Sequence, residues 1–278
     1  MKRYLSAFIG STVGVIAFGV GYLGISPSVS AQTMMITQQT APKTAVQWYN
    51  QGVDQLAAAD YKGAIKSFSE SIQLNPQDPD TYYNRGYAEH ILGNYDAAIK
   101  DYNQAIALQP KFAYAFGNRC YAFYILKDYQ KAIADCSTAI KLDPNYADFY
   151  IYRGNAQDDL GNPKTAIADY NQAIRLNPKH ANAYYNRGLT YNRLNEHNKA
   201  LADYSKSIEF DSKMADSFFN RGLTHYKLNN TTKAIADLQI AAQLFKTQEK
   251  TQYSQKALNL IKEIKTAEKS LSNKQNSN

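Results

Sequence analysis

Two cysteines are the residues of this chain most able to do covalent chemistry. Cys120 and Cys136 are its only cysteines and lie 16 residues apart. A redox-catalytic pair usually has the CxxC spacing, which this pair lacks. Outside the cytoplasm two facing thiols are expected to form a disulfide, whereas free buried thiols pack as small apolar side chains. The spacing therefore favours a structural role and leaves both states open.

The other polar residues show no arrangement typical of an enzyme or a metal site. The four histidines fall at unrelated positions of the sequence pattern: His90, His180, His197 and His225. Asp158 and Asp159 are adjacent, so their side chains point apart on a helix and make a poor acid–base pair. The glycines form no phosphate-binding loop. We expect no catalytic residue, no metal and no cofactor.

A pattern that repeats every 34 residues decides how these groups are positioned. A small residue recurs at Gly52, Gly86, Cys120, Gly154, Gly188 and Gly222. Alanine recurs at Ala64, Ala98, Ala132, Ala166, Ala200 and Ala234, and proline at Pro76, Pro110, Pro144 and Pro178. A further column reads Phe68, Tyr102, Cys136, Tyr170, Tyr204 and Leu238. These columns resemble the tetratricopeptide repeat (TPR), a helix–turn–helix unit, over residues 45–248.

The helical reading also follows from the residues themselves. In the second unit the apolar residues fall on one helical face: Ala98, Ile99, Tyr102, Ala105 and Ile106. Turns carry residues that tolerate a left-handed backbone, namely Gly93, Gly161, Asn195 and Asn229. Candidate N-caps follow at Asp60, Asn94, Asp128 and Asn162. One helix pair cannot bury its own apolar face, so the pairs must stack.

The resemblance implies an all-α fold, a TPR solenoid in which helix–turn–helix repeats form a right-handed superhelix. It divides the chain into six units: 45–78, 79–112, 113–146, 147–180, 181–214 and 215–248. An apolar stripe beyond them predicts a C-terminal capping helix over 249–268, because a terminal helix needs one apolar and one wet face. The polar residues 269–278 are expected to be a disordered tail, and 32–44 to be a linker.

The first residues look like a targeting segment. Lys2 and Arg3 precede a largely apolar run over residues 4–25, and Val29 and Ala31 stand where a signal peptidase reads small residues. We expect a signal peptide over 1–31, and therefore an exported, periplasmic or extracellular protein. The alternative is an uncleaved membrane anchor formed by 4–25, because the run is just long enough to span a bilayer.

The net charge argues against a nucleic-acid partner. The formal charge is +7 for the whole chain, and the basic residues are spread out. Nucleic-acid binding usually needs a focused basic face. We therefore expect no nucleic acid among the partners.

Two charged columns are in phase with the repeat. Arginine recurs at Arg85, Arg119, Arg153, Arg187 and Arg221, and aspartate at Asp101, Asp135, Asp169, Asp203 and Asp237. The two positions lie at similar heights on the facing helices of one unit. The pattern favours an ion pair inside each unit, and the alternative is a ladder of arginines that binds anions.

The first helix of each unit should line the inner surface of the stack. By resemblance to the TPR family, a peptide-binding groove there would contain Tyr83, Asn84, Tyr87, Tyr114, Asn118, Tyr121, Tyr124, Asn155, Asn186, Leu189, Asn220 and Leu223. Asparagine side chains can meet both the N–H and the C=O of an extended peptide. Tyrosine adds contact area at low entropic cost. Ordinary packing between repeats is the alternative role for these residues.

We therefore expect a non-enzymatic scaffold or adaptor of the cell envelope, which binds a segment of a protein or peptide partner in its concave groove. A helical-repeat nucleic-acid-binding protein and a purely structural spacer are the alternatives. The repeat also places the cysteines. Five units pair a small residue with a larger residue sixteen positions on, and only the third unit has cysteine at both places. The two sulfurs should face each other, as a disulfide or as two free thiols.

Overall fold

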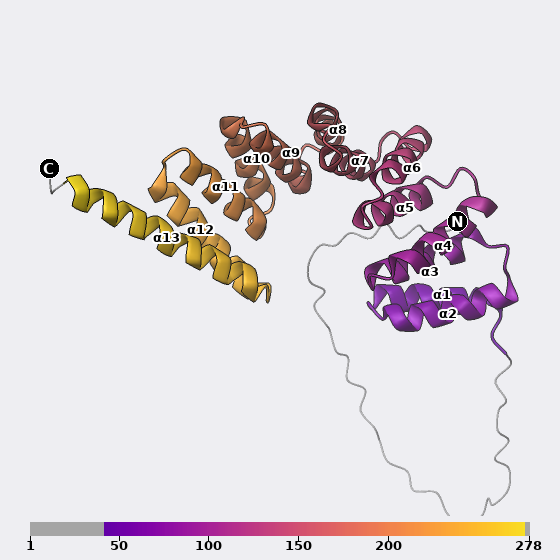
Figure 1. Ribbon diagram of the computed structural model, residues 1–278. Coiled ribbons are helices and arrows are strands. Elements are labelled where there is room, and N and C mark those ends of the chain that lie inside the picture. Colours follow the sequence, from indigo (N-terminus) through magenta and orange to yellow (C-terminus); the bar gives the residue numbers. More distant parts are fainter. Residues whose placement is uncertain (1–41, 276–278) are drawn as a thin grey trace, which may run out of the picture. The chain divides into compact units, whose positions relative to one another are not determined.

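The computed structural model describes residues 42–275, of which 43–275 belong to one compact unit. The predicted signal peptide, the alternative anchor over 4–25 and the linker residues 32–41 lie outside the described residues. In the described part the structure is all helical, without strands (Figure 1). None of these helices combines the length and apolar character that crossing a membrane requires.

Within the described residues, twelve helices form six consecutive pairs, which we number repeats 1 to 6, and a thirteenth follows. Their bounds are α1 Ala45–Ala57, α2 Tyr61–Leu74, α3 Pro79–Ile91, α4 Tyr95–Leu108, α5 Ala113–Ile125, α6 Tyr129–Leu142, α7 Ala147–Asp159, α8 Pro163–Leu176, α9 Ala181–Arg193, α10 His197–Phe210, α11 Ala215–Lys227, α12 Thr231–Thr247 and α13 Thr251–Gln275. This confirms the predicted all-α arrangement of helix pairs.

In four of the six repeats the turn after the first helix uses the predicted glycine or asparagine, whereas Ala59 and Lys127 take the positive φ angle in repeats 1 and 3. The turn residues Gly93 and Asn195 have positive φ angles of 81° and 61°. The amide of the following residue, Asn94 in repeat 2, donates to the Glu89 carbonyl at 2.9 Å and closes the helix end. In repeat 1 the Asp60 carboxylate accepts the Gly63 amide at 3.0 Å and caps the second helix.

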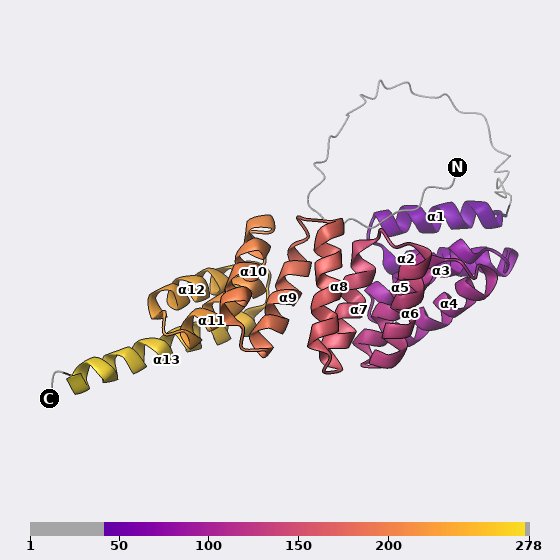
Figure 2. The same cartoon turned by 90° about the horizontal axis from the view of Figure 1, so that it is seen from above.

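The helices stack in chain order (Figure 2). Each odd-numbered helix packs on the even-numbered helix that follows it and on the one that precedes it. The odd helices also contact one another in sequence, from α1·α3 to α9·α11. They therefore form a continuous layer, and we call the surface through which they meet the odd-helix face.

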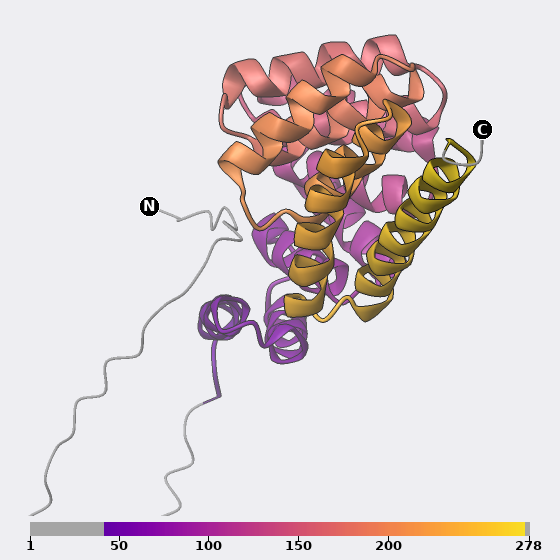
Figure 3. The same ribbon diagram turned by 90° about the vertical axis from the view of Figure 1, so that its left-hand side faces the viewer.

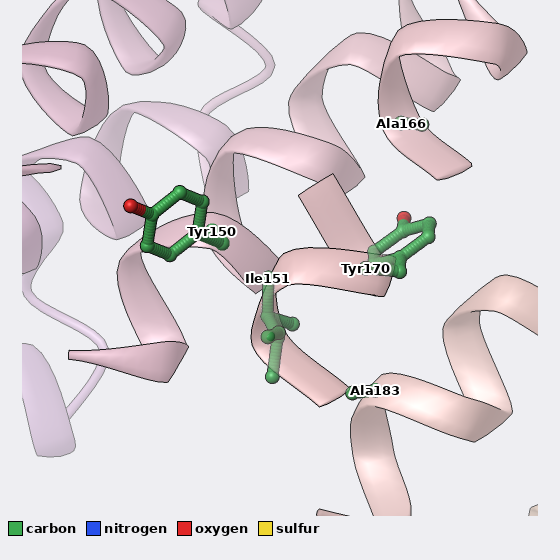
Figure 4. Close-up of a cluster of buried hydrophobic side chains, with 6 residues drawn as sticks. Tyr150, Ile151, Ala166, Tyr170 and Ala183 are labelled. Carbon is green, nitrogen blue, oxygen red and sulfur yellow. The ribbon is translucent and has the colours of Figure 1, made fainter. Parts of the chain in front are cut away.

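In repeats 1, 2, 4 and 5 the core contains a glycine packed against a ring, whereas repeat 3 has two cysteines there and repeat 6 has Gly222 against Leu238. The alanine column from Ala64 to Ala234 is fully buried. A Cβ atom built on Gly154 would lie 2.7 Å from the Tyr170 ring, too close for any side chain. Glycine is therefore needed where the helix backbone meets the ring. Figure 4 shows Tyr170 with Ile151 and Ala183, which join repeats 4 and 5 in one apolar cluster.

The last helix, α13, packs on α12 through Ala257, Ile261 and Ile264 (Figure 3). It runs from Thr251 to Gln275, so it is longer than the predicted capping helix over 249–268. The prediction of a disordered tail from residue 269 is wrong up to residue 275. Residues 251–275 contain no glycine or proline, so no residue type there stops the helix. Residues 276–278 lie outside the described part.

Candidate functional site

The predicted groove residues lie on the odd helices, and the structure shows what each kind contacts. Three of the asparagines form hydrogen bonds between neighbouring repeats. Asn84 donates to the Tyr49 hydroxyl at 3.2 Å, and Asn118 donates to the Tyr83 hydroxyl at 3.1 Å. Asn220 donates in the same way to Tyr185, at 3.2 Å. Each bond joins a repeat to the one before it, so these amides hold the stack together and offer less to a bound peptide than the sequence suggested.

Asn155 and Asn186 behave differently from that set. The Asn155 amide oxygen accepts the buried Tyr170 hydroxyl at 2.9 Å, a bond within repeat 4. Asn186 is half-buried on α9, and its backbone carbonyl accepts the Thr190 hydroxyl at 3.1 Å. In repeat 4 the asparagine column is replaced by Tyr152.

Aromatic rings connect the odd helices of repeats 2 to 4. Tyr121 of α5 lies 4.8 Å from Tyr152 of α7 and 5.2 Å from the stacked ring of His90 on α3, measured between ring centroids. Tyr124 lies 6.2 Å from Tyr121. This cluster joins the odd helices α3, α5 and α7. Tyr87 is half-buried on α3.

Two of the predicted tyrosines are mainly packing residues. Tyr83 lies 4.8 Å from the Phe112 ring, and burial raises its pKa well above the ordinary value. Tyr114 lies 5.2 Å from the Tyr146 ring in an edge-on arrangement. Both contacts belong to the junctions with the following repeats, which is the alternative role considered for these residues.

Repeat 3 has a glycine, Gly117, at the position where repeats 2 and 5 have Tyr83 and Tyr185. A Cβ atom on Gly117 would lie 2.1 Å from the Phe149 ring. Where repeat 4 has Phe149, the neighbouring repeats 3 and 5 have Ala115 and Ala183. The ring of one repeat therefore fills the space left by the glycine of the previous one. The exchange is visible in the sequence as two departures from the 34-residue pattern.

Hydrogen bonds and ion pairs connect the odd helices of repeats 4 to 6. Thr190 of α9 donates to the buried Asp158 carboxylate of α7 at 2.7 Å, and Arg193 lies 3.1 Å from the same group. Asn192 donates to the Thr224 hydroxyl of α11 at 2.7 Å. Burial raises the pKa of Asp158, while the Thr190 hydrogen bond and the Arg193 charge oppose this shift. The predicted residues Leu189 and Leu223 lie half-buried on α9 and α11 of this region.

The arginine and aspartate columns form five ion pairs, one in each of repeats 2 to 6. Arg119 binds Asp135 through two nitrogens, at 2.6 and 2.7 Å, and its third nitrogen binds Asn103 of the previous repeat at 2.6 Å. The aspartates are between 5% and 7% exposed. The ion-pair interpretation is confirmed, and the additional bond to the preceding repeat was missed by the sequence reading. Guanidinium groups engaged in this way do not support the anion-binding ladder.

Cys120 and Cys136 form a disulfide that joins α5 to α6, with their Cα atoms 5.4 Å apart. Both are fully buried and pack against Phe123, Tyr124 and Tyr129. The disulfide occupies the place that a glycine and a large side chain occupy in the other repeats. Tyr121 and Tyr124 follow Cys120 on the same helix, so the disulfide lies directly behind the aromatic cluster.

Profiles of known families match most of the helical array. Tetratricopeptide-repeat profiles match residues 79–112, 113–146 and 181–214, with further matches at 59–90, 159–195 and 136–168. The chain is a tetratricopeptide-repeat protein. Members of this family are generally non-enzymatic scaffolds that bind protein or peptide partners. No curated protein sequence matches the chain.

Solved structures share the fold of this TPR protein. The MamA protein is 25% identical over 62% of this chain and 93% of its own, with a TM-score of 0.54. A chain of the APC/C hetero-tetramer Cut9–Hcn1 is 19% identical over 81% of this chain and 44% of its own, with a TM-score of 0.70. YrrB, described as a TPR protein with an unusual peptide-binding site, is 22% identical over 70% of this chain and all of its own, with a TM-score of 0.52.

Across residues 42–275 there is no group of three or more acidic, histidine or cysteine side chains that could hold a metal ion. His180 instead contacts the Asp148 carboxylate at 2.9 Å, and His197 contacts the Asn192 side chain at 2.8 Å. These histidines therefore take part in contacts between or within repeats.

Proposed function

We propose that this TPR protein is a non-enzymatic scaffold that binds an extended segment of a protein partner along its odd-helix face. The observation that carries the proposal is the continuity of that face: five successive contacts between odd helices present one uninterrupted surface. YrrB, which shares the fold, is described as having a peptide-binding site. The family assignment supports binding of a protein rather than catalysis.

The tyrosines and leucines on this face supply the contact area. Tyr87 and Tyr121 in repeats 2 and 3 and Leu189 and Leu223 in repeats 5 and 6 occupy one position of the 34-residue pattern and are all half-buried. Partly exposed rings are effective anchors because they bury large areas with few rotatable bonds. The outer even helices present polar residues such as Gln130 and Lys131.

Cross-linking in the native cell tests which surface a partner touches. A photoreactive phenylalanine analogue would be placed at Tyr87 on the odd-helix face and, as the matched control, at Gln130 on α6. We expect a discrete cross-linked protein from position 87 and none from position 130. Cross-links that form only at position 130 would contradict the proposal, and so would cross-links at neither position. Resistance of the cross-linked species to nuclease separates a protein partner from a nucleic acid.

We also propose that the scaffold works in the cell envelope. The support is the charged start, the apolar run and the small residues before Gln32 in the sequence. N-terminal sequencing of the protein purified from its native cell should give a mature chain that begins at Gln32. Intact Met1 in the membrane fraction would favour the anchor over 4–25, and intact Met1 in the cytoplasm would contradict export.

A further inference from the structure

A small apolar patch lies on the odd-helix face of repeats 2 and 3. Tyr87 and Ile91 are four residues apart on α3, and Tyr121 and Ile125 are four residues apart on α5. Residues at this spacing share one helix face. The helices contact each other, and the two isoleucines are 38% and 37% exposed. We call these four residues the apolar patch.

Further along the array only the second of these two positions becomes charged. The first position holds Asn155, Leu189 and Leu223 in repeats 4 to 6, and the second holds Asp159, Arg193 and Lys227. Asp159 accepts the Tyr124 hydroxyl at 3.0 Å and lies 3.3 Å from Arg193. Charge therefore begins where the apolar patch ends, at the junction of repeats 3 and 4.

Several groups next to the apolar patch are uncharged, although Glu89 and Lys127 each lie two residues from one of its isoleucines. His90 stacks on Tyr121, and burial lowers the pKa of its ring to about 4, so the ring is neutral at pH 7. Leu92 and Leu126 follow the two isoleucines and are 38% and 44% exposed. Exposed apolar side chains gathered in one place mark interaction surfaces more often than isolated ones do.

Two buried polar atoms beside the apolar patch have no hydrogen-bond partner in the described structure, the Tyr102 hydroxyl and the His90 Nδ1 atom. Burial raises the pKa of the Tyr102 hydroxyl, and the nearby Asn118 amide opposes this shift. The hydrogen bond of that amide, however, goes to the Tyr83 hydroxyl. The equivalent hydroxyl of repeat 4, on Tyr170, is bonded to Asn155. Buried polar groups are normally satisfied. Tyr102 is fully buried, so a polypeptide backbone on this face offers donors and acceptors to the half-buried His90 alone, directly or through water.

We propose that the apolar patch is where the partner docks, and that the docked segment is an extended, uncharged stretch of polypeptide with aliphatic side chains. This inference rests on the proposed scaffold function and assigns the partner's chemistry. Aliphatic side chains bury area against the two isoleucines and the two rings, while the backbone supplies hydrogen bonds. A charged side chain placed against the isoleucines and rings loses hydration, and these apolar groups offer it no hydrogen bond.

Selection from a random peptide library tests this chemistry directly, because it does not require the partner to be identified. Random 12-residue peptides displayed on phage would be selected against the purified full chain. The enriched peptides would then be measured by fluorescence anisotropy on the unaltered protein and on the variant Ile91→Asp/Ile125→Asp. Ile240→Asp on α12 is the matched control, because Ile240 is a similarly exposed isoleucine, at 44%, outside the patch. Circular dichroism checks folding, and Ile125→Asn is a milder second variant.

We expect enrichment of uncharged peptides rich in leucine, isoleucine and valine. Their Kd should rise about tenfold or more in the double variant and change less than about twofold in the control. Enriched acidic or basic peptides would overturn the inference and leave the scaffold function standing, and so would peptides insensitive to the double variant. No enriched peptide would contradict both. Co-sedimentation with phosphatidylcholine vesicles that the double variant abolishes would overturn the inference in favour of a lipid surface.

Discussion

Ring contacts, with single hydrogen bonds beside them, join α3, α5 and α7 in the odd-helix face, whereas α7, α9 and α11 are joined by hydrogen bonds and an ion pair. Tyr121 meets His90 and Tyr152 in the first region. Asp158 meets Thr190 and Arg193 in the second. Both regions join helices of the same length at the same spacing. The comparison shows that one repeat fold can present an apolar surface over one part of its length and a polar surface over the rest.

Ring contacts and polar contacts differ in what they leave for a partner. A carboxylate that already accepts a hydroxyl and faces a guanidinium has few unused interactions, as Asp158 shows. A stacked ring still offers its edge and its remaining exposed area. The aromatic region is therefore the better candidate for binding, and the polar region the better candidate for fixing how repeats 4 to 6 stack.

The largest predicted effect is on stability and concerns repeat 3, where the disulfide stands in place of a large side chain between the two helices. Replacing both cysteines of repeat 3 by serine should lower the free energy of unfolding by about 3 kcal/mol, because the disulfide restricts the unfolded chain over a 16-residue separation. Urea unfolding with and without a reductant measures the loss, which reduction of the unaltered protein should match.

Alkylation gives the direct check on the disulfide. The denatured, unreduced chain should show no reactive thiol, and peptide mapping should join the segments that contain Cys120 and Cys136. Two alkylatable thiols would remove the disulfide from the account and leave the alternative of two packed cysteines. An unfolding midpoint insensitive to reductant would contradict the predicted stabilisation.

The second prediction separates the two regions by pH. His90 in the aromatic region is neutral when folded, with a pKa of about 4, whereas it titrates at its ordinary 6.5 when unfolded. Its stabilising contribution is complete above pH 6.5 and is lost as the pH falls towards 4. Between pH 7 and 4.5 the unaltered protein should lose about 2 kcal/mol relative to His90→Phe, which keeps a ring against Tyr121.

The polar region should respond in the opposite direction. Burial raises the pKa of Asp158, so its ionised form opposes folding above that pKa, and acidification relieves this cost. Relative to the Asp158→Asn variant, the unaltered protein should therefore gain stability as the pH falls through the raised pKa of the folded state towards the ordinary value of 3.8. Denaturant titrations at several pH values test both signs. Equal pH dependence of His90→Phe and the unaltered protein would contradict the assignment of a buried neutral His90.

The smallest predicted effect lies at the boundary of the two regions. Tyr124 donates to Asp159 at 3.0 Å across the junction of repeats 3 and 4. Tyr124→Phe removes this hydrogen bond and keeps the ring, so it should cost about 0.5–1.5 kcal/mol in unfolding free energy. Thermal unfolding followed by circular dichroism is sufficient to detect it. A change near zero would show that the hydroxyl finds an equivalent partner in water.

The 34-residue pattern made the contacts within each helix pair predictable from the sequence. Columns such as Gly154 with Tyr170 predict the helix pairs, because only glycine fits against a ring at that distance. The same columns place Cys120 opposite Cys136, where the structure joins them. These predictions concern contacts inside one helix pair, which the spacing along the chain nearly determines.

Contacts between repeats were harder to predict. The bond from Asn118 to Tyr83 depends on how one helix pair is rotated against the next, and no column reveals that rotation. The sequence therefore suggested asparagines free for a peptide where the structure uses them between repeats. Ile91 and Ile125 were missed as well, although their spacing from Tyr87 and Tyr121 was a signal that could have revealed them.

The central claim is that the partner binds at the aromatic region of the odd-helix face. The most direct measurement compares the affinity of the cross-linked partner segment for two double variants at one repeat position, Tyr87→Ala/Tyr121→Ala and Leu189→Ala/Leu223→Ala. We predict that the tyrosine variant loses about tenfold or more in affinity, with unchanged helical content, while the leucine variant changes by less than about threefold. A tyrosine variant that binds as tightly as the unaltered protein, or a loss confined to the leucine variant, would contradict the claim.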